Sequence, residues 1–88
     1  MEKRHENSLM GMLEKVAFEG FASKPKWQIA RYYKQSNFTL NIRRDIRDRW
    51  KNLVTDELGW KQTPVLKMAD VGGEIIFMKG GDFFPDKE

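Results

Sequence analysis

Five cationic side chains lie within nine residues near the middle of the chain: Arg43, Arg44, Arg47, Arg49 and Lys51. Guanidinium and ammonium groups neutralise phosphate, and arginine also donates paired hydrogen bonds to it. Residues 21–51 hold nine Lys or Arg against two acids, although the net charge of the whole chain is only +3. This concentration of charge indicates a surface that binds a polyanion; the alternative is a basic face that is merely solvated.

The acidic side chains nearby do not form an obvious catalytic group. Asp45 precedes Arg49 by four residues, the favourable order for an ion pair on a helix, and Asp48 is a candidate to accept a hydrogen bond from cytosine. The chain has one histidine, His5, no cysteine and no glycine-rich phosphate loop followed by Lys and Ser or Thr. We therefore expect no enzyme, no catalytic residue, no metal site and no cofactor.

A helix from Thr39 to Leu58 is predicted to position the basic residues. Thr39 or Asn41 is a suitable N-cap, and Gly59 is typical of a helix end. The apolar residues recur at the spacing of one helical face. They are Ile42, Ile46, Trp50, Leu53, Val54 and Leu58. The opposite face carries Arg44, Arg47, Asp48, Lys51 and Thr55, with Arg43 on the flank.

Two further helices are predicted before this one. The first covers residues 9–19 with Ser8 as N-cap. The second has Ser23 as N-cap and Pro25 inside its first turn, and it ends near residue 34 or 35. The break between them places Phe21 in the core. In the second helix Trp27 is more often a core residue than a stacking platform in so small a domain.

The connection to the third helix and the C-terminal part complete the predicted fold. Phe38 and Leu40 are expected to fix the angle between the second and third helices. Two apolar runs, 65–69 and 74–79, are separated by a segment containing Gly72 and Gly73, which predicts a two-stranded β-hairpin. The fold class is thus α+β, a three-helix helix-turn-helix core followed by a hairpin.

The boundaries of this domain are set by composition. Residues 1–7 are predicted to be a flexible tail, residues 8–79 the domain and residues 80–88 a second tail, in which Phe83 and Phe84 could cover the sheet. Residues 1–7 lack the order of a signal peptide, and no apolar run reaches the ~20 residues of a membrane span. We expect a protein of the cytoplasm, associated with the nucleoid, or of the nucleus, and not a secreted one.

Three helices followed by a hairpin resemble the winged helix-turn-helix domain, and residues 41–59 look like its recognition helix. The resemblance implies that the third helix enters the major groove of DNA and that the hairpin touches the adjacent minor groove or backbone, here through Lys67 or Lys79. Residues 46–53 are also similar to the third helix of Myb-like domains. That similarity covers eight residues and leaves the hairpin without a place.

These observations predict a sequence-preferring double-stranded DNA-binding protein, a small regulator of transcription or replication. Phosphate contacts are expected from Lys26, Arg31, Lys34, Arg43, Arg49 and Lys51, and sequence preference from Asn41, Arg44, Arg47 and Asp48. A homodimer through the first helix would raise specificity. One alternative is a protein-interaction module that docks on an acidic partner, favoured if Met10, Met12, Phe83 and Phe84 are exposed. Another is RNA binding through Trp27, Tyr32 and Tyr33.

Overall fold

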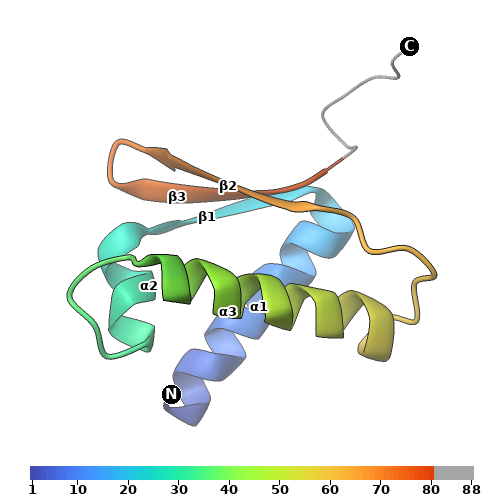
Figure 1. Cartoon of the computed structure of the whole chain (residues 1–88), viewed down its shortest axis with the longest axis horizontal. Coiled ribbons are helices and arrows are strands. Elements are labelled where there is room, and N and C mark those ends of the chain that lie inside the picture. The colour runs from blue at the N-terminus through green and yellow to red at the C-terminus, as the bar shows by residue number, and fades with distance from the viewer. Residues whose placement is uncertain (81–88) are drawn as a thin grey trace.

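The computed structural model describes residues 1–80, which form three helices and a three-stranded antiparallel sheet, an α+β fold (Figure 1). The elements are α1 (Lys3–Glu19), β1 (Phe21–Pro25), α2 (Lys26–Tyr32), α3 (Leu40–Asn52), β2 (Leu66–Val71) and β3 (Glu74–Lys79). A single π-helical turn, η1 (Leu53–Glu57), extends α3. The helices lie on one side of the sheet. None of the helices in residues 1–80 is long and apolar enough to cross a bilayer.

The helix α3 follows from its local sequence as predicted. The Thr39 hydroxyl oxygen accepts a hydrogen bond from the Ile42 backbone N–H at 3.3 Å, which confirms Thr39 as the N-cap. Gly59 has a φ of +70°, so it ends the helical segment in the left-handed conformation that favours glycine. The predicted apolar stripe is buried except for the half-buried Leu58.

The helix α1 begins at Lys3 rather than at Leu9, so Ser8 lies inside the helix and caps nothing. Residues 3–7, expected to be a flexible tail, are helical because two of them have partners on other elements. The carboxylate of Glu6 pairs with Arg49 on α3, and the ring of His5 stacks on Tyr32 of α2 with centroids 5.0 Å apart. These contacts hold the first turns of α1 against the rest of the fold.

The sheet has the strand order β1-β3-β2, so the predicted hairpin gains a third strand. Residues 66–71 and 74–79 form the hairpin, and Gly72 and Gly73, with φ of +59° and +84°, form its two-residue turn. A hairpin alone is marginally stable in water, and β1 pairs with residues 74–78 of β3. The prediction of a two-stranded sheet was therefore wrong.

The segment that becomes β1 was predicted as a break, and its side chains follow the alternation of a strand instead. Ala22 is buried, whereas Phe21 is 52% exposed, so the expectation that Phe21 fills the core was wrong. Pro25, not Ser23, is the N-cap residue of α2, and α2 ends at Tyr32. Lys34 adopts a φ of +57°, and the Gln35 N–H returns to the Ala30 carbonyl at 2.9 Å, which stops the helix. Phe83 and Phe84 lie outside the described residues.

Candidate functional site

Three cations form a stripe along the exposed face of α3. Arg44, Arg47 and Lys51 follow one another at steps of three and four residues, so they share one side of the helix. All three are exposed, and none of their side chains has a hydrogen bond or ion pair with another residue in the range 1–80. Asn41 and Asp48 are exposed beside them. We call these five residues the α3 face.

The α3 face is held rigidly from behind. Ile42, Ile46 and Trp50 occupy the opposite side of the helix and are 2% exposed or less. The indole Nε1–H of Trp50 donates to the Pro64 carbonyl oxygen at 2.7 Å, which ties the helix to the segment that leads into β2. The packing of Ile42, Ile46 and Trp50 therefore fixes the position of α3, and the side chains of the α3 face lie on its outer side.

Leu40 lies at the start of the α3 face, and sequence reasoning missed it. We expected Leu40 to anchor the angle between the helices, but its side chain is 59% exposed. Leu40 precedes the buried Ile42 by two residues, and a rotation of about 200° takes it to the outer side of the helix. The helical periodicity contained this signal. An exposed leucine beside arginines gives the α3 face one apolar contact point.

Arg43 lies on the flank of α3, as predicted, and is half-buried. Its guanidinium carbon is 4.8 Å from the ring centroid of Phe38, within the range of a cation–π contact. Phe38 in turn packs against the core. The ring fixes the position of this cation and leaves part of it accessible at the edge of the α3 face.

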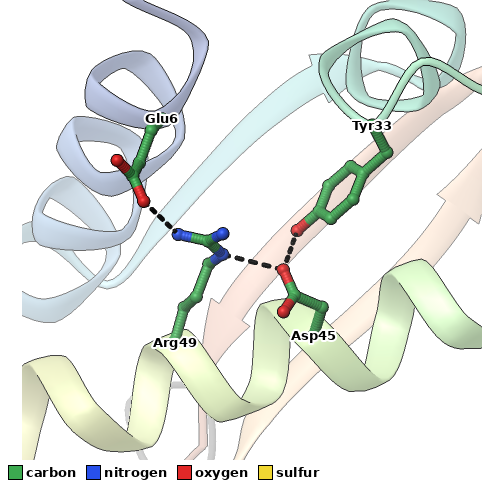
Figure 2. Close-up of polar contacts among 4 residues, drawn as sticks. All are labelled: Glu6, Tyr33, Asp45 and Arg49. Atoms are coloured by element: carbon green, nitrogen blue, oxygen red, sulfur yellow. Dashed lines mark hydrogen bonds and ion pairs between the residues drawn. The ribbon is translucent and has the colours of Figure 1, made fainter. Parts of the chain in front are cut away.

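Arg49 belongs to an internal network that joins three parts of the chain (Figure 2). Its Nε donates to Asp45 Oδ2 at 2.7 Å, as the spacing of the two residues predicted, and its Nη1 lies 3.0 Å from Glu6 Oε2 on α1. The hydroxyl of Tyr33 donates to the same Asp45 oxygen at 2.6 Å. The structure thus gives Arg49, which we expected to contact phosphate, a role in fixing α1 against α3.

The network shifts the pKa values of its members. Burial raises the pKa of Asp45, but the hydrogen bonds from Tyr33 and Arg49 outweigh this effect and lower it below its ordinary 3.8. The hydrogen bond from Arg49 also lowers the pKa of Glu6. Burial and the neighbouring Asp45 carboxylate raise the pKa of the Tyr33 phenol. The charged carboxylates and the neutral phenol are therefore the favoured forms at neutral pH.

The other predicted binding residues lie on different elements from the α3 face. The Lys26 Nζ pairs with Asp70 Oδ2 of the hairpin at 2.6 Å, and Arg31 and Lys34 are exposed at α2 and at its end. Lys67 lies opposite Met78 in the register of β2 and β3, toward the end of the hairpin away from the Gly72–Gly73 turn. Lys79 is further still from the turn.

The hairpin turn is consequently not cationic. Asp70 and Glu74 flank it, and the charge of Asp70 is paired with Lys26. The Nζ of Lys79 donates to the Ala17 carbonyl at 2.9 Å and lies 5.3 Å from the Trp60 ring centroid. Residues 70–75 contain no lysine or arginine, so the tip of the hairpin has no cation of its own to contact a phosphate.

No protein-family model, curated protein or solved structure matches this chain. Within residues 1–80 no three His, Cys, Asp or Glu side chains lie where they could hold a metal ion. Within residues 1–80, the exposed cations are concentrated on the α3 face.

Proposed function

We propose that the chain binds double-stranded DNA, with α3 in the major groove, as a small regulator built on a winged helix-turn-helix scaffold. The observation that carries this proposal is the α3 face: Arg44, Arg47 and Lys51 are exposed, share one side of a rigid helix and lack partners within residues 1–80. The order of three helices with a hairpin after the third agrees with the scaffold.

Each member of the α3 face has a chemically reasonable role in this complex. Arg44 and Arg47 can donate paired hydrogen bonds to O6 and N7 of guanine or to phosphate, and Lys51 neutralises phosphate. Asn41 can bind the edge of adenine, Asp48 can accept from cytosine, and the exposed Leu40 can contact a thymine methyl group. Arg43 adds charge at the margin of the α3 face.

The proposal assigns no phosphate contact to the tip of the hairpin. Asp70 is paired with Lys26 and Glu74 adds a negative charge, so the tip does not attract phosphate. Contacts outside α3 would then come from Arg31 and Lys34, which are exposed at α2 and at its end. This is the main difference from the contacts that the winged helix resemblance implies.

The protein-interaction alternative requires that Met10, Met12, Phe83 and Phe84 are exposed. Met12 is 6% exposed and Met10 is half-buried, so the described part of α1 offers little methionine surface, and the two phenylalanines lie outside the described residues. Met12 is likewise unavailable for a dimer contact through α1. RNA binding through Trp27, Tyr32 and Tyr33 also has less support. Tyr32 is buried, and the Tyr33 hydroxyl donates a hydrogen bond to Asp45.

The test is binding of a fluorescent random-sequence duplex and a matched single strand, titrated over a range of salt concentrations. The slope of log affinity against log salt should change by about 0.9 for each phosphate contact removed, so Arg44→Ala with Arg47→Ala should flatten it by about 1–2 units. The matched control, Lys3→Ala with Lys15→Ala, removes the same charge from exposed positions of α1 and should leave the slope nearly unchanged.

Two results would contradict the proposal. If the two double variants weaken duplex binding equally, net charge rather than the α3 face is responsible and the proposal fails. It also fails if the wild-type protein does not bind duplex at low salt. A thermal melt of each variant checks that the exposed substitutions leave the fold intact, which is expected because none of the four side chains contributes to the core.

A further inference from the structure

Trp27 is the one tryptophan whose ring the fold does not use. Trp50 is buried, and Trp60 is half-buried with its ring against Phe18 and Lys79. Trp27 is 64% exposed, and its indole has no ring contact or hydrogen bond with another residue in the range 1–80. The sequence-based expectation of a core residue was wrong. The exposed indole face is therefore available to stack on a planar ligand.

Trp27 lines an open pocket of about 290 Å³ between the first turns of α1 and α2. The α1 side supplies Arg4 and His5, and the α2 side supplies Gln28, Arg31 and Tyr32. The ring of His5 stacks on that of Tyr32 with an angle of 30° between the planes, so part of the wall is already a stack of aromatic rings. The volume is close to the lower limit for small-molecule sites.

The charge of this pocket is positive. No carboxylate lines it. The side chain of Arg31 has no hydrogen bond or ion pair with any residue that the structure describes. The side chain of Arg4 pairs only with Glu2, at 3.1 Å, where both side chains are more than half exposed. Such an exposed ion pair is worth little and gives way easily to a stronger anion. Two guanidinium groups are therefore available beside one free indole face.

We propose that this pocket binds a nucleotide. The base would stack on Trp27, the amide of Gln28 would bind its edge, and Arg31 with Arg4 would hold the phosphate. The shared chemistry is a planar base linked to a phosphate, which either a free mononucleotide or an unpaired nucleotide of a single strand provides. The site lies on α1 and α2 and shares only Arg31 with the proposed duplex contacts, so it does not depend on the α3 face.

The experiment follows the indole Nε1–H signal of Trp27 by NMR during titration with deoxyguanosine 5′-monophosphate. Assigned signals separate Trp27 from the other two tryptophans. Saturable shifts with a Kd of about 1 mM or below are expected. Deoxyguanosine and inorganic phosphate each supply half of the chemistry and should bind at least about tenfold more weakly. Equal binding by phosphate alone would overturn the proposal, because the aromatic ring would then contribute nothing.

Variants identify the residues responsible. Trp27→Ala and Arg31→Gln should each weaken binding about tenfold or more. The matched control for the ring is Phe18→Ala, a change at another exposed aromatic residue, and it should have no effect. The absence of saturable shifts up to about 10 mM nucleotide, or full binding by Trp27→Ala, would refute the site. Dispersed amide signals in each variant show that it is folded.

Two further measurements distinguish a free nucleotide from an unpaired strand, and the Trp27 pocket from the α3 face. A short single strand that shifts the Trp27 signal at lower concentration than the mononucleotide would identify an unpaired strand, and the reverse order a free nucleotide; both support the site. The Arg44→Ala, Arg47→Ala variant should keep mononucleotide binding. If that variant loses it, the Trp27 pocket is not the independent site proposed here. Loss of duplex binding in that variant with retention of nucleotide binding supports both proposals.

Discussion

Replacement of Tyr33 by phenylalanine tests whether the network around Arg49 stabilises the fold. The substitution removes a single oxygen atom, and with it the hydrogen bond that the hydroxyl donates to Asp45 Oδ2 at 2.6 Å. The aromatic ring stays in place, so the apolar packing of this half-buried residue does not change. Any loss of stability can then be attributed to the hydrogen bond.

The magnitude follows from the exposure of the acceptor. A hydrogen bond to a charged group contributes about 1.5–3 kcal/mol when both partners are buried. The side chain of Asp45 is 42% exposed, so water replaces the hydroxyl in the variant and the loss falls to about 1 kcal/mol. For a domain of this size that corresponds to a decrease in Tm of roughly 4–8 °C.

The loss should depend on pH, and the direction at each end follows from the pKa shifts. The pKa of Asp45 in the folded protein is lowered below 3.8, so its contribution is present above that value and disappears as the pH falls through the lowered pKa. The pKa of Tyr33 is raised above its ordinary 10.0, so its contribution is present below pH 10 and is lost as the pH rises further. The difference between wild type and variant should thus be greatest between these limits and smaller outside them.

The assay is thermal unfolding followed by circular dichroism from about pH 2.5 to pH 11. Tyr32→Phe is the matched control, because it makes the same change at the adjacent residue, whose hydroxyl has no hydrogen bond with a residue in the range 1–80. It should change stability by less than about 0.5 kcal/mol. The reasoning is refuted if Tyr33→Phe unfolds with the wild type at neutral pH, or if its deficit persists unchanged at the lowest pH at which the protein still folds.

Two further predictions concern the backbone and the core. Urea unfolding measures the change in stability in each case, provided that the variant keeps the m-value of the wild type. Gly73→Ala places a Cβ at a φ of +84° in the hairpin turn and should destabilise the fold by about 1 kcal/mol. Gly11 is exposed within α1, and nothing lies within 4 Å of the carbon that alanine would add. Gly11→Ala should therefore stabilise the fold by about 0.5–1 kcal/mol. Effects of the same sign at the two glycines would contradict this. Trp50→Phe removes the 2.7 Å hydrogen bond to Pro64 and leaves a small cavity, and it should cost about 2 kcal/mol; a neutral result would show that this bond does not anchor α3.

The features that the sequence predicted correctly depend on short-range signals. The helix α3 has its cap at Thr39, its apolar period and its terminal Gly59 within about twenty residues, and each can be recognised locally. The hairpin turn is set by two adjacent glycines. The exposure of Arg44 and Arg47 follows from the same helical period. Helix boundaries and solvent-facing side chains of this kind require no knowledge of the rest of the fold.

The features that were missed depend on partners that are distant in sequence. The strand β1 exists because Phe21 and its neighbours pair with β3, whose Met78 lies opposite Phe21, and a five-residue segment shows no such pairing by itself. The early start of α1 depends on Arg49, which is forty-three residues from Glu6. The pocket at Trp27 likewise requires α1 to lie against α2. Sequence periodicity contains none of these pairings.

The network around Arg49 also explains how so small a chain keeps a strongly basic surface. Residues 41–52 contain five cations and two acids, and the structure uses one acid, Asp45, to pair with Arg49 on the inner side of α3. That pairing holds α1 in position through Glu6 and removes from the outer side the carboxylate that would otherwise neutralise an arginine there. Asp48 remains as the single acid of the α3 face. The internal pair therefore stabilises the fold and at the same time preserves the positive field through which α3 would meet a phosphate backbone.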